Sequence, residues 1–225
     1  MEITSIQLLS SNIEQQKKFY SESLGFSLKE TKNGFSIQAG ATKLSFELDL
    51  NGNNFYHFAF LVADNHFEDC LTYVKNKGIS ILPDKFTSEE ITYWDNNSGR
   101  SFYFYDADKN IVEFITRPSL NYLSDQPWSI NEIIKINEIG TPVNAPLETS
   151  TYLLNNFPFS IPQHNIDRFN DTFCWYGSFE GTLLVVKKGR EWYPTAHEAI
   201  SSNLKLQIQE KTDLIHLNFQ NGKFT

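Results

Sequence analysis

Cysteine is scarce in this chain of 225 residues, which contains only Cys70 and Cys174. Two cysteines exclude a disulfide scaffold or a CxxC-type metal site, so a buried core must hold the fold together. The chain also lacks a run of about 20 apolar residues, the length that a membrane span needs. Its first residues lack the basic and apolar segments of a secretory signal. We therefore expect a cytoplasmic protein with no membrane partner.

Basic residues are also few, since 19 Lys and Arg stand against 27 Asp and Glu, for a formal net charge of −8. They form no cluster, which argues against nucleic acid as a partner. Aromatic residues are abundant, with 19 Phe and 10 Tyr. They favour strands and an aromatic interior, in a chain long enough for one large domain or two smaller ones.

Two consecutive segments share one predicted order of elements, a strand, a helix and then three strands. In residues 1–54 the helix begins at Asn12, and in residues 55–117 it begins at Asp64. The second helix has apolar residues at i, i+3, i+4 and i+7, and Cys70 on this stripe is expected in the core. A displacement of about fifty residues predicts an internal repeat.

The second segment ends in two strands joined by a polar turn over residues 106–110. Asp and Asn favour such a turn because they tolerate its dihedral angles and bond their own backbone. The last strand places Glu113 on one face with Ile111 and Ile115. An acid among apolar neighbours is unfavourable unless something pairs with it, so Glu113 is predicted to be a rim residue or a ligand.

A third, degenerate unit is predicted over residues 131–225, after a connector at residues 118–130. Its expected elements are a strand at 133–143, a helix that opens at 144–148, and strands near 172–176, 182–187, 204–209 and 214–219. An unpaired third unit requires a partner surface. That surface is expected to be the first two units, the C-terminal strand or the same unit in a homodimer.

These motifs together resemble the vicinal oxygen chelate superfamily, which includes glyoxalase I, bleomycin-resistance proteins, fosfomycin-resistance enzymes and extradiol dioxygenases. The resemblance rests on residues 12–26, on the strand that starts at His57, and on residues 102–113. The last stretch is similar to the signature Asp-Pro-Asp-Gly-Asn-x-x-Glu, with Ala107 and Lys109 in place of Pro and Gly.

The resemblance covers residues 1–117 and implies an α+β fold. In this fold, paired βαβββ modules, here residues 1–54 and 55–117, form one open, cup-shaped mixed sheet. The third degenerate module would add to this cup.

The resemblance also implies a divalent metal in the cup, with up to four ligand positions. They fall on Ser5, Glu47, His57 and Glu113. Ser5 is a poor metal ligand, while Gln7 lies on the same face of the strand two residues further along. Strand alternation directs Glu47, His57 and Glu113 into the cup. One imidazole and two carboxylates suit Zn²⁺, Ni²⁺, Mn²⁺ or Fe²⁺.

Three aromatic residues, Trp94, Tyr103 and Tyr105, are predicted to face the cup, where they would bind a flat ligand or only pack the sheet. Arg100 would meet a ligand carboxylate or be a solvated turn residue. The loop at residues 189–195 is interpreted as a tertiary anchor, with a lid or a dimer contact as the alternatives. The other histidines are expected at the surface: His66, His164, His197 and His216.

The leading functional hypothesis is an enzyme of glyoxalase or dioxygenase type, a metal-dependent lyase, isomerase or dioxygenase that acts on a small oxygenated molecule. Glu47, His57 and Glu113 would hold the metal, and Glu47 or Glu113 would double as the catalytic base. One alternative is a metal-free, bleomycin-resistance-like protein in which these groups hydrogen-bond to each other. Another is an interaction module that dimerises through the third unit. The substrate stays open, because this scaffold hosts several reactions.

Overall fold

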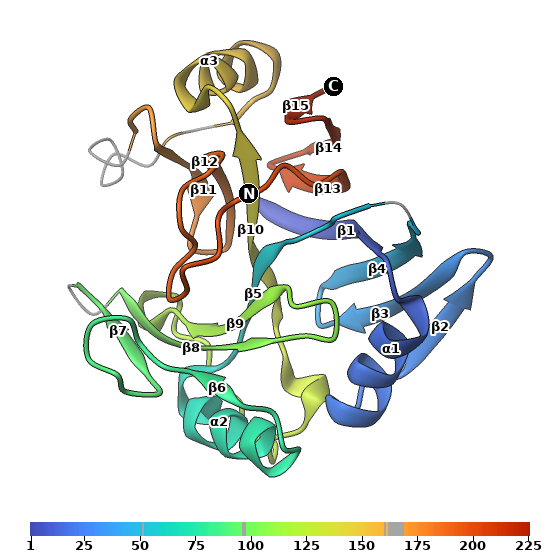
Figure 1. The fold of residues 1–225 in the computed structure, drawn as a ribbon. Coiled ribbons are helices and arrows are strands. Elements are labelled where there is room, and N and C mark those ends of the chain that lie inside the picture. The colour runs from blue at the N-terminus through green and yellow to red at the C-terminus, as the bar shows by residue number, and fades with distance from the viewer. Residues whose placement is uncertain (51, 96–97, 160, 162–168) are drawn as a thin grey trace.

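The computed structural model describes residues 1–50, 52–95, 98–159, 161 and 169–225, whose strands form two mixed sheets (Figure 1). Sheet A has the strand order β15-β14-β13-β1-β4-β3-β2. Sheet B has the order β11-β12-β10-β5-β9-β8-β6, and the short strand β7 (Thr92–Trp94) pairs with β8. None of the helices in these residues has both the length and the apolar character to span a lipid bilayer.

The first module contains one helical segment and four strands of sheet A. Its elements are β1 (Glu2–Ser10), α1 (Ile13–Lys18), the π-helix η1 (Phe19–Ser23), β2 (Leu28–Thr31), β3 (Gly34–Ala39) and β4 (Thr42–Leu48). Asn12 caps α1 because its side-chain oxygen accepts a hydrogen bond from the Gln15 N–H. The module therefore has the predicted order βαβββ.

The second module repeats this order in sheet B. Its elements are β5 (His57–Leu61), the 3-10 helix η2 (Asp64–His66), α2 (Phe67–Asn76), β6 (Ile81–Leu82), β8 (Gly99–Tyr105) and β9 (Ile111–Thr116). Cys70 is buried on the apolar stripe of α2, as its spacing predicts. The turn between β8 and β9 is held by Asp106, whose carboxylate accepts hydrogen bonds from Asn110 and Gln16.

The residues after the 3-10 helix η4 (Pro118–Leu120) complete both sheets. Sheet B receives β10 (Lys135–Val143), β11 (Phe173–Ser178) and β12 (Gly181–Lys187), with η5 (Ile130–Glu132) and α3 (Pro146–Asn156) beside them. Sheet A receives β13 (Leu204–Glu210), β14 (Asp213–Gln220) and β15 (Lys223–Phe224).

The modules pair differently from the expectation. The α+β class, with βαβββ modules that form open sheets, is confirmed. However, β1 pairs with β13 and β5 pairs with β10, so residues 1–54 and 55–117 lie in separate sheets rather than in one cup. Each opening strand has one free edge within its own module, and the third unit fills both edges. The surface that the third unit needs is therefore found within the chain.

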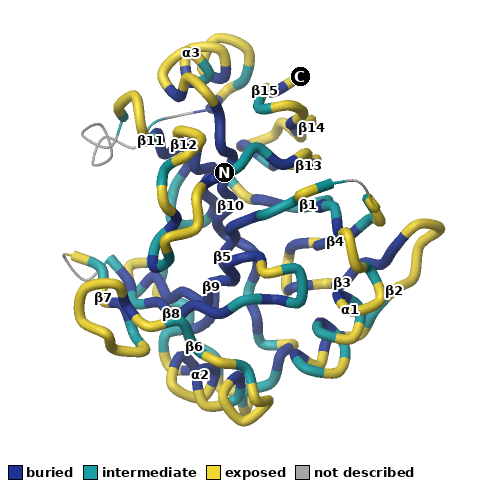
Figure 2. Tube along the Cα trace, viewed as in Figure 1, coloured by how far each residue is buried: buried dark blue, intermediate teal, exposed yellow. Residues whose placement is uncertain are grey.

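The main core lies between the two sheets, with side chains from α1 and α2. Thr42 links the sheets, because its hydroxyl donates to the Ile3 carbonyl at 2.7 Å and accepts from the Ile136 N–H at 3.0 Å. Strands β5, β9 and β10 are buried along their whole length, as Figure 2 shows at the centre of the molecule. Side chains on their second face are therefore also shielded from water.

Candidate metal site

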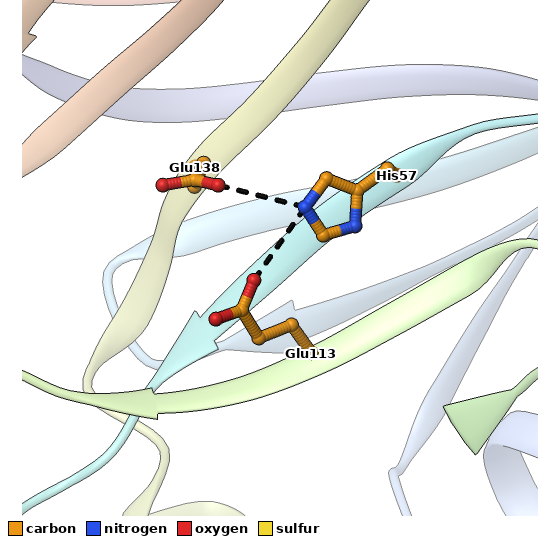
Figure 3. A group of neighbouring side chains, drawn as sticks. All are labelled: His57, Glu113 and Glu138. Carbon is orange, nitrogen blue, oxygen red and sulfur yellow. Dashed lines mark ion pairs between the residues drawn. The ribbon is translucent and has the colours of Figure 1, made fainter. Parts of the chain in front are cut away.

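Two carboxylates and one imidazole converge on the face of sheet B opposite the main core, from the neighbouring strands β5, β9 and β10 (Figure 3). The Nε2 atom of His57 lies 3.5 Å from Oε2 of Glu113 and 3.5 Å from Oε1 of Glu138. One ligand atom from each residue lies within 4.8 Å of the other two. All three residues are buried.

Strand register brings His57 and Glu113 together. In the parallel pair β5–β9, His57 is opposite Ile111 and Ala59 is opposite Glu113. The two side chains therefore lie one rung apart on one face, because side chains alternate along a strand. This face is the one that alternation predicts for both residues.

A β-bulge brings Glu138 to the same face. Across β5–β10, Ile136 is opposite Phe60 and Glu138 is opposite Ala59, so Asn137 is an extra residue in β10. Without the bulge, alternation would place Glu138 on the face of Ile136, which lies in the main core. The bulge thus re-aims one carboxylate toward His57.

Hydrogen bonds and an ion pair fix the direction of each atom that could bind a metal. His57 Nδ1 lies 3.2 Å from the Ile111 carbonyl, and donation there leaves the Nε2 lone pair directed at the carboxylates. Glu113 accepts on Oε1 from the hydroxyls of Ser101 and Tyr103, the latter at 3.0 Å, and turns Oε2 toward His57. Glu138 pairs through Oε2 with Arg117 Nη2 at 3.6 Å and turns Oε1 toward His57.

The groups also perturb one another electrostatically. Burial and the charge of Glu138 raise the pKa of Glu113 to about 7, against the opposing effect of His57 and Ser101. Burial lowers the pKa of His57, but Glu138 and Glu113 outweigh it and raise the pKa overall. Burial and the Glu113 charge raise the pKa of Tyr103 well above its usual value, so the phenol stays protonated as a donor.

A cavity of about 620 Å³ opens over these residues. Its walls are largely aromatic, from Trp94, Tyr103, Trp175, Trp192 and Tyr193. The volume lies in the range that small-molecule sites occupy. Polar groups that converge at the floor of an aromatic cavity can orient a small ligand.

The loop at residues 189–195 closes one side of this cavity. Trp192 is buried, and the centre of its ring lies 5.0 Å from that of His57. The hydroxyl of Tyr193 donates to Asp84, and its ring packs 5.5 Å from that of Trp94. These contacts agree with the interpretation of the loop as a tertiary anchor.

Glu47, Ser5 and Gln7 lie on sheet A, and none of them lines the cavity. The pairing of β1 with β4 follows the same register as that of β5 with β9 when Ser5 is matched to His57. Gln7 is opposite Ser45 and Leu9 is opposite Glu47, so the position that corresponds to Glu113 is Ser45. The assignment of Glu47 to the ligand set is therefore corrected, since Glu47 lies one rung too far along β4 in the other sheet.

Among the other predicted site residues, Trp94 and Tyr103 line the cavity and Tyr105 does not. The Tyr105 ring instead packs edge-on at 5.6 Å against His197. Arg100 is also outside, because alternation on β8 directs it toward α2, where it donates to Glu68 at 2.8 Å. Its assignment as a ligand-binding residue is corrected accordingly.

The remaining histidines follow the surface expectation in two cases. His197 and His216 are exposed, whereas His66 is buried, with Nε2 at 2.8 Å from the Gln126 carbonyl, and its prediction is corrected. His164 lies outside the described residues.

Sequence reasoning missed Glu138, Arg117, Trp175 and Trp192. A signal for Glu138 was present, since Ser5 and His57 each lie seven residues before the helix starts predicted at Asn12 and Asp64. Ala145 precedes α3, and counting back seven residues from it reaches Glu138. The matching position on β12 is Leu184, which lines the cavity and offers no ligand atom.

No protein-family model matches this chain. No curated protein matches it either. Among solved structures, a "putative dioxygenase" from Bacillus subtilis is similar, with 12% identity, a TM-score of 0.57, and coverage of 83% of this chain and 63% of that protein. Two smaller structures match about half of this chain.

The first of these is a lactoylglutathione lyase from Agrobacterium tumefaciens, with 18% identity, a TM-score of 0.44, and coverage of 53% of this chain and 96% of that protein. The second is the oxidase ChaP-H1, with 23% identity, a TM-score of 0.44, and coverage of 53% and 98%. The chain has the fold of the vicinal oxygen chelate superfamily.

Proposed function

We propose that this protein is a divalent-metal-dependent enzyme of glyoxalase or dioxygenase type that acts on a small oxygenated organic molecule in the cavity of sheet B. The observation that carries the proposal is the convergence of His57, Glu113 and Glu138 at the floor of an aromatic cavity. In this proposal Glu138 takes the ligand place that the sequence had assigned to Glu47.

The distances between the imidazole nitrogen and the carboxylate oxygens support the proposal that a metal binds here. Nitrogen and oxygen ligands bind Zn²⁺ at about 2.0–2.2 Å, which places two neighbouring ligands of a tetrahedral site about 3.4 Å apart. The distances of 3.5 Å from His57 Nε2 to each carboxylate are close to this value. Each carboxylate also has its second oxygen held by the protein, as ligating carboxylates commonly do. One imidazole and two carboxylates suit Zn²⁺, Ni²⁺, Mn²⁺ or Fe²⁺.

A metal bound here would polarise vicinal oxygens of the substrate and stabilise an enolate-like anion. The protein itself contributes positioning and proton transfer. Ser101 and Tyr103 hold Oε1 of Glu113, so its Oε2 keeps a fixed direction. In the metal-free site the pKa of Glu113 is raised to about 7. A bound cation would favour the carboxylate form, so Glu113 would act as a base only when it leaves the metal. The indole of Trp192 covers His57 and excludes water from that side.

Charge balance supports a second candidate function, a metal-free binding protein. Arg117 and a protonated His57 together compensate the charges of Glu113 and Glu138. In that case the aromatic cavity would hold a ligand without chemistry. The two candidates differ in whether a cation stabilises the folded protein.

Metal analysis of protein purified without chelator, together with thermal unfolding in the presence of Zn²⁺, Mn²⁺ or Ni²⁺, tests the proposal. We expect about one metal per chain and a rise in Tm with added metal. His57→Ala and Glu138→Gln should abolish both effects, because each removes one of the three ligands.

Glu47→Gln is the matched control, since Glu47 is a strand carboxylate outside the cavity, and it should retain full metal binding. Wild-type protein without metal, and with a Tm that added metal leaves unchanged, would favour the metal-free candidate. Loss of binding in Glu47→Gln but not in Glu138→Gln would contradict the assigned ligands.

A further inference from the structure

Arg190 lines this cavity without a carboxylate partner among the residues that the structure describes. Four charged groups at the floor form one continuous chain: Glu113, His57, Glu138 and Arg117. Arg190 lines the same cavity and is half-buried, yet no carboxylate in the described part of the chain pairs with its guanidinium. Burial also lowers the pKa of Arg190, which indicates that the charge is partly removed from water.

Nearby acidic groups do not neutralise Arg190. The adjacent Glu191 pairs with Lys85, which belongs to the loop before β7. Asp95 lines the cavity together with Glu113 and Glu138. It is exposed and makes no ion pair in the described residues. A partly desolvated guanidinium is stabilised by a planar anion that can accept two parallel hydrogen bonds.

The walls beside Arg190 suit a flat apolar group. The guanidinium lies 5.0 Å from the ring centre of Phe173, and Trp175 and Trp192 line the same cavity. Leu184 occupies the position on β12 that matches Glu113 on β9, so this side of the floor is apolar. In addition, the buried indole N–H of Trp192 has no acceptor among the described residues, so a ligand oxygen can satisfy it.

We propose that the cavity takes a planar aromatic ligand that carries a carboxylate, and that Arg190 binds this carboxylate while the ring packs among Phe173, Trp175 and Trp192. The inference deepens the proposed function, because it names a substrate class for the same cavity. It does not depend on a metal, since Arg190 forms no ion pair with Glu113 or Glu138, which pair with His57 and Arg117 in the described structure.

Calorimetric titration with 2-naphthoate and its uncharged isostere 2-naphthamide tests the inference, in buffer with EDTA so that no metal contributes. For the wild type we expect the carboxylate to bind about tenfold more tightly than the amide or better, the range of a charge-assisted hydrogen bond. Arg190→Met should reduce the ratio to about one, whereas Arg190→Lys should retain part of it because the charge remains.

Arg100→Met is the matched control, since Arg100 lies outside the cavity on the other face of β8, and it should keep the wild-type ratio. Circular dichroism checks that each variant folds. Equal affinity of the wild type for both probes, no measurable binding of either, or a ratio that Arg190→Met leaves unchanged would overturn the inference. Charge preference without metal binding would leave it standing while the enzyme proposal fails, and metal binding without charge preference would do the reverse.

Discussion

Sheets A and B are built from the same βαβββ design, yet among the described residues only sheet B has a group of side chains that could hold a metal. In sheet A the three corresponding positions hold Ser5, Ser45 and Lys205. The sheets also differ in burial, because β1 and β4 alternate between covered and open residues while β5, β9 and β10 are covered on both faces. The repeated module therefore places three side chains at matching positions in both sheets. Only where these side chains can bind a metal and aromatic residues shield them does a candidate site result.

Deletion of Asn137 should have the largest effect of the changes considered, because it removes the bulge that sets sheet B apart. Removal of this bulged residue restores regular alternation in β10, so that either Ile136 or Glu138 must change face. Either outcome buries a carboxylate in the core or withdraws a large apolar side chain from it, at a cost of several kcal/mol. We expect loss of cooperative thermal unfolding and of metal binding, measured by circular dichroism and metal analysis.

Deletion of Thr4 is the control in sheet A, where a bulge also interrupts the pairing of β1 with β13. It displaces only the first residues of the chain, so a smaller decrease in Tm and normal metal binding are expected. If the Asn137 deletion behaved like the Thr4 deletion, the bulge would not be what directs Glu138 into the site.

Much of the fold was predictable because it is local. Helix caps such as Asn12, apolar spacing in α2 and the turn at residues 106–110 act within a few residues of sequence, and the βαβββ order follows from them. Strand partners are not local. The free edge of β5 can pair with any extended segment, and nothing in the sequence near His57 identifies β10 as its neighbour.

In the candidate site, too, the features that depend on nearby residues were predictable and those that depend on strand pairing were not. The face of His57 and of Glu113 follows from simple alternation along a strand. Glu138 was missed because a bulge breaks alternation in β10, and alternation alone places this residue in the core. Glu47 was chosen from the family resemblance, and its face of the strand agreed with that choice. Register between two strands decides how far along the sheet a residue lies, and register is invisible in one sequence.

The pH dependence of the free energy of unfolding should distinguish the buried carboxylates of sheet B from the carboxylates of sheet A. Without metal, we expect the free energy of unfolding to fall as pH rises from about 5 to 8. The pKa of Glu113, raised to about 7 from 4.5, means that the folded protein keeps a proton that the unfolded chain has lost, so stability decreases as pH rises through this window. The effect is on the order of 3 kcal/mol.

His57 acts in the same direction, because its folded pKa is raised above 6.5 and its contribution is lost as pH rises through the folded value. Denaturant unfolding in EDTA at several pH values measures the slope. Glu113→Gln should remove much of it, and Glu47→Gln on sheet A should leave it intact. Identical slopes in wild type and Glu113→Gln would show that Glu113 titrates normally in the folded state.

The smallest effect is expected when donors are placed at the matching positions of sheet A. In the double variant Ser5→His with Ser45→Glu, an imidazole and a carboxylate occupy the rungs that His57 and Glu113 occupy in sheet B. Metal per chain should stay at the wild-type value, because Lys205 stands at the third position and repels a cation. Stability should change by no more than about 0.5 kcal/mol, as for most surface substitutions.

Adding Lys205→Glu to this double variant gives sheet A an imidazole and two carboxylates at the positions that match His57, Glu113 and Glu138. A second metal should then bind, but more weakly than the first, because Lys205 is exposed and water competes for open ligand groups. Quantitative metal titration separates the two classes of site. If the double variant alone gained a second metal of equal affinity, two donors at the right rungs would suffice, and neither the third carboxylate nor the aromatic cover would be what distinguishes sheet B.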